Sequence, residues 1–289
     1  MSTGPAERAD AAPEPEIPAE LVGSGGGGRH LGRLFAPSVW APAVVAVGIA
    51  VVVWQLLALH NPQDLPRIGA IWQQLSNRPG FYARNTGSTM LETAVGLAAG
   101  FVVAFVLGAL MCHVRIFERG VMPLAVMLNV TPVVALAPGL AIVFQFGYMP
   151  KFIVTAIIVF FPFLVNSLTG LRSVDPEALD VLRTLDASTA EIFVRLRLPS
   201  SLPFLFSAAR VCLPLSIVGA VVAEFVVSGT TSGLGVFISS ARSEAGPYAL
   251  AEIYAAIAIL VAIGLAFTVL VIALEARFLS WHASARRRS

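Results

Sequence analysis

Long uncharged stretches alternate with short charged ones along most of the chain. Asp, Glu, Lys and Arg are all absent from residues 39–59, 93–112, 152–171 and 253–274. Each stretch is close to the roughly 20 residues that a helix needs to cross the hydrocarbon core of a bilayer. Because that core holds no water to pair with backbone N–H and C=O groups, helix is the expected structure. The pattern predicts an all-α membrane protein of about six transmembrane helices, at about residues 39–60, 88–112, 120–146, 151–171, 203–228 and 249–274.

The third span is the least regular of the six. Residues 120–150 carry no charge and include Pro123, Pro132 and Pro138. As one straight helix they would measure about 46 Å, which is too long for a single span. Proline removes a backbone donor and kinks or breaks a helix. We therefore expect one bent span, followed by a short re-entrant or irregular stretch near residues 138–147.

Composition agrees with this interpretation. Hydrophobic residues make up 57% of the chain, charged residues 12%, and the mean hydropathy is +0.81. A soluble domain has about a quarter of its residues charged, so most of this chain faces something other than water. Residues 1–35 differ, because they are rich in Pro, Gly and acids and cannot bury a core. We expect a disordered cytoplasmic tail at 1–35, a membrane domain at 36–282 and a short basic tail at 283–289.

The 19 Lys and Arg residues are distributed unevenly between the two sides that six spans define. An even number of spans puts both termini on one side, and most of the basic residues lie on that side. The opposite side holds only Arg67, Arg78, Arg84, Lys151 and Arg242. Basic residues are enriched in cytoplasmic loops. We therefore expect a multi-pass plasma-membrane protein with both termini in the cytoplasm and no nucleic-acid partner.

Catalytic and metal-binding motifs are missing from the sequence. The only lysine, Lys151, follows Tyr-Met-Pro, whereas a P-loop needs a lysine after glycine. Any ATP hydrolysis must therefore take place on another polypeptide, and no cofactor or metal is expected on this chain. His113 and His282 lack companion ligands. Cys112 and Cys212 are expected to be free thiols.

The loop between the fourth and fifth spans, residues 172–202, carries the most informative pattern. Asp175 followed by Pro176 is typical of a helix start. Leu179, Leu182 and Leu185 then recur at helical spacing and predict one apolar face.

A second short helix is predicted in the same loop. Ser188 or Thr189 would cap it, and its apolar face would include Leu196. Pro199 and Pro203 are expected to end it before the fifth span begins. The loop should thus form an amphipathic helical hairpin on the cytosolic surface.

This loop resembles the EAA loop of ATP-binding-cassette (ABC) importer permeases. That motif runs Glu-Ala-Ala, three residues, Gly, nine residues, then Ile-x-Leu-Pro. The same spacing here gives Asp180-Val181-Leu182, then Asp186, then Leu196-Arg197-Leu198-Pro199. Asp186 replaces the usual Gly, and Asp tolerates the left-handed backbone region better than most residues.

The resemblance extends over nearly all of residues 39–281. Residues 131–152, 160–177 and 219–238, and Leu65-Pro66 ahead of a predicted helix at 68–75, are similar to one branch of that family. The branch imports nitrate, taurine, sulfonates, pyrimidine precursors of thiamine or riboflavin, and this chain looks most similar to the pyrimidine and riboflavin members.

The resemblance implies a transport subunit with no enzymatic activity of its own. Its expected partners are a cytosolic ABC ATPase dimer that holds ATP and Mg, a second permease copy (a homodimer rather than a heterodimer), an extracytoplasmic solute-binding protein and the lipid bilayer. The residues that it assigns to ATPase coupling are Glu177, Leu179, Asp180, Leu182, Arg183, Leu185, Asp186, Ala187, Ser188, Leu196, Leu198 and Pro199.

Ionisable groups inside a span are functional candidates by default. Arg210 lies near the cytosolic end of the fifth span, where its side chain could snorkel. Glu224 lies about 21 Å further along the same helix, either as a water-facing rim residue or as a gate or solute contact. Glu92 is expected at the membrane interface. Weaker pathway candidates are Pro132, Phe161 and Phe163.

Two other classes of protein compete with the permease interpretation. A channel or secondary carrier would need polar groups along several spans. An integral membrane enzyme would need polar residues that converge at one site. Arg210 and Glu224, the ionisable groups placed within spans, are far apart in the sequence.

Overall fold

The computed structural model describes residues 37–227, 231–244 and 249–278. The expected tails at 1–35 and 283–289 lie outside these ranges and stay predictions. The chain divides into two compact units, residues 1–57 and 58–289. Most of helix α2 (Pro37–His60) belongs to the first unit, and its apolar part, Val44–His60, corresponds to the first predicted span.

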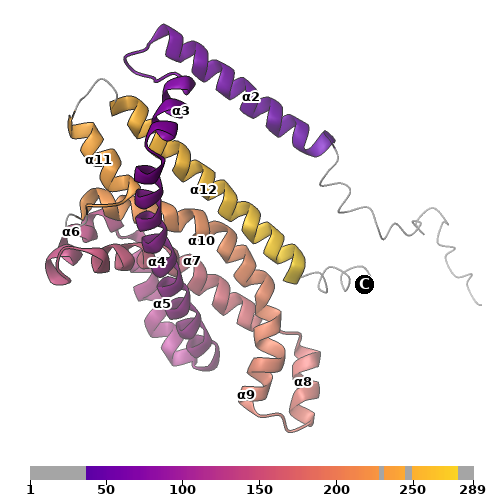
Figure 1. Ribbon diagram of the computed structural model, residues 1–289. Coiled ribbons are helices and arrows are strands. Elements are labelled where there is room, and N and C mark those ends of the chain that lie inside the picture. The colour runs from indigo at the N-terminus through magenta and orange to yellow at the C-terminus, as the bar shows by residue number, and fades with distance from the viewer. Residues whose placement is uncertain (1–36, 228–230, 245–248, 279–289) are drawn as a thin grey trace, which may run out of the picture. The chain divides into compact units, whose positions relative to one another are not determined.

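The described part of the second unit is helical and contains no strand. Figure 1 shows the α8–α9 hairpin at one end of the long helices α4, α7, α10 and α12, and α11 at their other end. Its helices are α3 (Ile68–Asn77), α4 (Pro79–His113), α5 (Arg115–Val130), α6 (Val133–Val143), α7 (Tyr148–Arg172), α8 (Pro176–Thr184), α9 (Thr189–Ile192), a π-helical turn (Phe193–Arg197), α10 (Leu198–Val226), α11 (Leu234–Glu244) and α12 (Ala249–Phe278).

Within the described ranges, four helical segments are long and apolar enough to cross a membrane. They are α4, α7, the continuous stretch Thr189–Val226 and the Ala249–Glu275 part of α12. Helices α5 and α6 together form a further candidate, bent by 102° at their junction. With α2, each of the six predicted spans corresponds to a helix or to this bent pair.

The bend in the third span lies at Pro132. Thr131 before it has an extended backbone (φ −69°, ψ 127°), as expected for the residue that precedes a proline. The predicted kink is confirmed, but the position of the irregular stretch was wrong in part. Helix α6 continues past Pro138, and the irregular residues are 144–147, where Gln145 and Gly147 have positive φ.

Two further boundaries differ from the predictions. Helix α4 begins at Pro79 rather than near residue 88. Pro199 and Pro203 do not end a helix, because Pro199 lies in the first turn of α10, where the missing N–H costs little. The π-helical turn joins α9 to α10 without a break.

The predicted outer loop after the fifth span contains a helix, α11.

Helix α7 packs against α4 on one side and α10 on the other. The contact face of α4 carries small residues four positions apart: Gly96, Gly100, Ala104 and Gly108 are all buried. A Cβ atom on Gly100 would lie 2.5 Å from Val159 Cγ2 and 2.7 Å from the Ala156 carbonyl oxygen. Because lipid does not drive apolar helices together, such close packing is a main source of helix association in membranes.

The glycine contact gives a test with a matched control in the same helix. Gly100→Ala places a methyl group against backbone that cannot move aside, and overpacking of this kind costs about 1–3 kcal/mol. Gly87→Ala meets no atom within 4 Å and should gain about 0.5–1 kcal/mol from helix propensity. Thermal unfolding of the purified protein in detergent should show a lower midpoint for Gly100→Ala only. Equal midpoints for the two variants would contradict the packing assignment.

Candidate functional site

The first helix of the loop starts as the sequence predicts. Asp175 is the N-cap of α8, and its Oδ1 accepts a hydrogen bond from the Glu177 N–H at 3.0 Å. Pro176 occupies the first helical position, where no backbone donor is needed.

Two local features stabilise the turn of the α8–α9 hairpin. Asp186 adopts the left-handed conformation, with φ 51°, so the expectation that it takes the place of the motif glycine in this backbone region is confirmed. Ser188 and Glu191 then form a capping box: Ser188 Oγ accepts from the Glu191 N–H, and Glu191 Oε2 accepts from the Ser188 N–H at 2.9 Å. Reciprocal bonds of this kind fix a helix start.

The apolar residues of α8 point in two directions. Leu179 lines a cavity between α8 and the bundle, and Leu182 is half-buried. Val181 and Leu185 are 58% and 71% exposed. The apolar face predicted from Leu179, Leu182 and Leu185 is therefore divided. Of these three only Leu185 is exposed, and Val181, which was not predicted, is exposed beside it.

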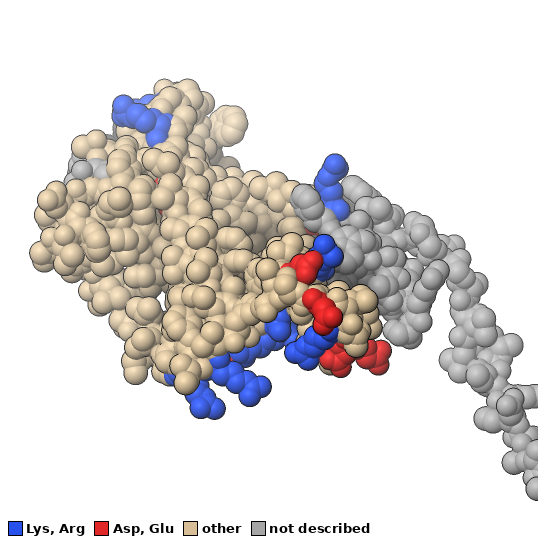
Figure 2. Space-filling model, turned by 90° about the horizontal axis from the view of Figure 1, so that it is seen from below, with Lys and Arg blue, Asp and Glu red and all other residues tan. Residues whose placement is uncertain are grey.

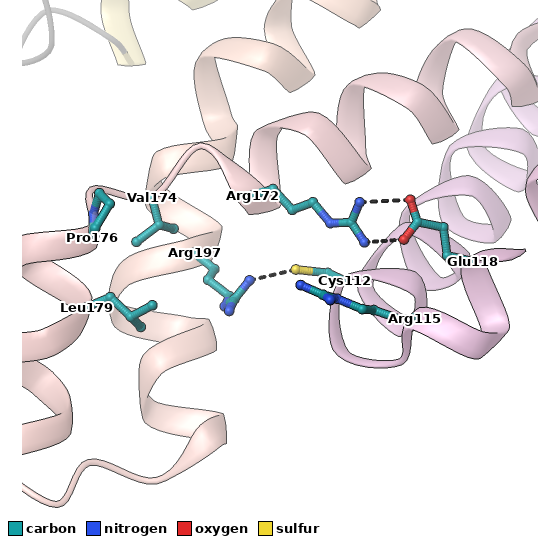
Figure 3. A pocket seen from close by; sticks show the side chains of 8 residues that line it. All are labelled: Cys112, Arg115, Glu118, Arg172, Val174, Pro176, Leu179 and Arg197. Carbon is teal, nitrogen blue, oxygen red and sulfur yellow. Dashed lines mark hydrogen bonds and ion pairs between the residues drawn. The ribbon is translucent and has the colours of Figure 1, made fainter.

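The cavity behind α8 measures about 570 Å³ and brings together residues that are distant in sequence (Figure 3). Arg172, at the end of α7, donates to both carboxylate oxygens of Glu118 on α5, at 2.8 and 2.5 Å. Arg197 donates to the Leu171 carbonyl oxygen at 3.2 Å and to Cys112 Sγ. Arg197 therefore joins the π-helical turn that follows the hairpin to the ends of α4 and α7, and Arg172 joins α7 to α5. Sequence reasoning did not find this cavity.

A second polar cluster is buried near the opposite ends of these helices. Lys151 Nζ lies 3.1 Å from Glu92 Oε1, and both side chains have no exposed surface. Glu92 was expected at the membrane interface and Lys151 on the outer side, and the structure buries both side chains inside the protein. Because α4 begins at Pro79, Glu92 lies well inside this helix, and Lys151 belongs to the first turn of α7.

Glu224 is the third ionisable member of this cluster. Its Oε1 accepts from the Thr89 hydroxyl at 2.8 Å, and its Oε2 accepts from the Gly235 N–H at 2.5 Å. With 3% of its surface exposed, it is not the water-facing rim residue that was one of two expectations. Its role as a gate or solute contact stays a prediction.

The same cluster holds the turn that leads into α11. Asn85 Oδ1 accepts from the Gly233 N–H, and Thr89 Oγ1 accepts from the Leu234 N–H, both at 2.9 Å. A Cβ atom on Gly233 would lie 2.2 Å from Glu224 Oε1, so this close approach requires glycine. The polar residues at positions 85, 89 and 92 recur at helical spacing along α4, and this pattern could have indicated that they share one face of the helix.

The remaining pathway candidates have different surroundings. Arg210 forms an ion pair with Glu275 on α12, so it has a protein partner where the sequence predicted snorkelling. Phe163 is 4% exposed and lines an apolar cavity of about 560 Å³ between α4, α7, α10 and α12. Phe161 is half-buried, and Pro132 lies at the bend between α5 and α6. Cys112 and Cys212 are free thiols, as expected.

Comparison with known proteins agrees with this architecture. Residues 96–280 match the family model described as "Binding-protein-dependent transport system inner membrane component". The riboflavin transport system permease protein RibX of Chloroflexus aurantiacus is 31% identical over 89% of this chain and 95% of its own length. The formylaminopyrimidine transport permease protein ThiX of Halalkalibacterium halodurans is 32% identical over 64% of this chain and 75% of its own.

A solved structure shares the fold. A chain of the inward-facing MetNI methionine ABC transporter superposes with a TM-score of 0.61 at 15% identity, covering 70% of this chain and 98% of that chain. At this identity the likeness concerns the fold alone.

The chain belongs to the family of inner-membrane components of binding-protein-dependent transport systems. It is a multi-pass membrane permease subunit of an ABC importer and not an enzyme, as the resemblance implied. Membership of the ABC importer class implies a separate ATPase partner.

The backbone at Asp186 yields a prediction about the hairpin. A β-branched side chain is strongly disfavoured at positive φ, whereas glycine is not. Asp186→Val should destabilise the turn by about 1–2 kcal/mol, and Asp186→Gly should preserve it. Amide hydrogen exchange over residues 176–197 should be faster in the Val variant only. Equal protection in both variants would show that the left-handed turn does not control the hairpin.

Proposed function

We propose that the α8–α9 hairpin is the element through which a cytosolic ATPase drives this permease. The observation that carries the proposal is the hairpin itself, in which a left-handed turn and a capping box present exposed Val181 and Leu185. Short amphipathic helices of this kind bind by laying their apolar side into a groove. Acidic and basic side chains of α8 (Glu177, Asp180 and Arg183) would form the polar rim.

Other residues of the motif act from behind the docking surface. Leu179 and Arg197 pack the hairpin against the bundle through the cavity of Figure 3. Movement of α8 would therefore pull on the ends of α4, α5 and α7. Ala187, Leu196, Leu198 and Pro199 shape the turn and the start of α10.

The proposed assembly has two ATPase subunits, two copies of this permease and an extracytoplasmic binding protein. ATP and Mg would be bound by the ATPases, whose closure brings the two hairpins together and opens the bundle outward. The charge distribution supports cytoplasmic termini, because basic residues gather at the hairpin end. On the face seen from below, Lys and Arg gather mainly along one edge, next to Asp and Glu, and uncharged surface covers most of the rest (Figure 2).

The solute is best sought among small organic and anionic compounds. RibX and ThiX, by their names, transport riboflavin and formylaminopyrimidine, so a pyrimidine thiamine precursor or riboflavin is the first choice. Nitrate, taurine and sulfonates remain in the set. Thermal shift of the binding protein encoded nearby, with each of these compounds, identifies the solute directly.

Docking through the exposed part of α8 can be tested by co-purification with the ATPase. The double variant Val181→Asp/Leu185→Asp puts two charges where an apolar contact is expected and should abolish the complex. Val181→Ile/Leu185→Met keeps the apolar surface and should retain it. Because both residues are exposed, neither variant should change the thermal midpoint of the isolated permease. Retention of the ATPase by the Asp variant would contradict the docking assignment.

Glu224 gives a separate prediction for the outer end of the pathway. Glu224→Ala removes the acceptor of the Gly235 N–H and the Thr89 hydroxyl, and each unpaired buried group costs about 1–3 kcal/mol. Uptake should fall while ATPase co-purification stays intact. The control is Glu252→Ala, because Glu252 forms an ion pair with the exposed Arg78 and such pairs are worth about 0–1 kcal/mol. Normal uptake by the Glu224 variant would contradict this role.

A further inference from the structure

The buried cluster near α11 contains one more acidic group than basic groups. Lys151 faces Glu92, and Glu92 in turn faces Glu224, close enough for their carboxyl groups to share a hydrogen bond. Glu92 and Lys151 have no exposed surface, and Glu224 has 3%. Tyr148, whose ring centroid is 6.0 Å from Lys151 Nζ, is the other titratable group beside them. With every group in its usual ionised form, the cluster would carry an uncompensated negative charge.

An unbalanced charge is energetically costly for side chains that are buried to this extent. A buried carboxylate without a compensating cation loses its hydration, and in practice the group takes up a proton instead. Ionisable groups inside a membrane domain are tolerated where they pair with one another. One added proton makes the set of two carboxyl groups and one ammonium neutral.

The hydrogen bonds identify the carboxyl group that holds this proton. Both oxygens of Glu224 accept from donors, the Thr89 hydroxyl and the Gly235 N–H, and hydrogen bonds of this kind stabilise the ionised form of a carboxyl group. Glu92 Oε1 accepts from Lys151 Nζ. Glu92 Oε2 is buried and has no hydrogen-bond partner among the described residues. Glu92 and Glu224 lie close enough to share a side-chain hydrogen bond, and an O–H at Oε2 would supply its proton.

We propose that the cluster is a proton-binding site, in which Glu92 is a neutral carboxylic acid protonated at Oε2 that bridges Lys151 and ionised Glu224. The proton forms a bond to Oε2 and a hydrogen bond to Glu224, and no other group changes. Glu92 is thereby a positioning residue. It keeps Glu224 charged and in place, and Glu224 holds the turn at Gly235 that begins α11.

Three variants of the two glutamates test the assignment. Glu92→Gln reproduces the protonated acid, because its amide oxygen accepts from Lys151 and its NH₂ donates to Glu224. Glu92→Ala removes both bonds. Glu224→Gln has one acceptor oxygen for two donors and places an NH₂ group against one of them. Each change is introduced separately into the full transporter, and uptake is measured per assembled complex. The thermal midpoint of each purified permease variant is measured as well.

We expect Glu92→Gln to keep uptake and midpoint close to those of the unmodified protein. Glu92→Ala and Glu224→Gln should lower uptake by roughly tenfold or more, since each leaves a buried polar or charged partner unsatisfied. If Glu92→Gln keeps function and Glu92→Ala loses it, residue 92 must be a neutral hydrogen-bonding group. A requirement for a negative charge at residue 92 would instead impair both variants. If Glu92→Gln is as impaired as Glu92→Ala, or if all three variants behave normally, the proposal is wrong.

Infrared spectroscopy tests the proton without reference to transport. At neutral pH, the difference spectrum between the unmodified permease and Glu92→Gln should contain the C=O stretch of a protonated carboxylic acid. A difference spectrum with carboxylate bands alone would show that Glu92 is ionised and would overturn the proposal. Because this measurement needs no ATPase and no solute, its outcome is independent of the coupling role proposed for the hairpin.

Discussion

Close approach between α4 and α7 is the constraint on which the rest of the described bundle depends. In lipid, apolar side chains gain little by contacting each other rather than acyl chains, so backbones must come near enough for dense packing. Gly96 and Gly100 allow this, with Thr155 and Val159 filling the space that larger side chains would occupy. The same face of α4 carries Glu92 one turn before Gly96, so the packing that joins the helices also presses Glu92 toward Lys151.

Hydrogen bonds and ion pairs between polar side chains link the helices at both ends of this packed core. At one end, Arg197 joins the segment after the α8–α9 hairpin to α7, and Arg172 joins α7 to α5. At the other, Glu224 ties the turn before α11 to α4. The hairpin's second helix and Glu224 belong to one continuous helical stretch, Thr189–Val226. One continuous helical stretch therefore runs from the hairpin end of the bundle to the Glu224 end.

The errors of the sequence interpretation share a physical origin. Pro199 and Pro203 were expected to stop a helix, but the first turn of a helix has no use for the missing N–H, and α10 accommodates Pro203 in its interior. Glu92 and Lys151 were placed at the surface because charges avoid lipid. That rule holds for an isolated ionisable group and not for two hydrogen-bonded partners, 59 positions apart, that meet inside the protein.

The sequence by itself determined the membrane class, the approximate spans, a proline bend in the third span and a helical hairpin that begins at the cap Asp175. All of these depend on interactions among residues within a few turns, which hydrophobic runs, prolines and capping residues encode directly. Only the tertiary structure decided which side of α8 is exposed, that Arg172 reaches Glu118, and that Glu92, Lys151 and Glu224 form one buried cluster. These contacts join segments far apart in the chain, and a single sequence does not specify which distant helix faces meet.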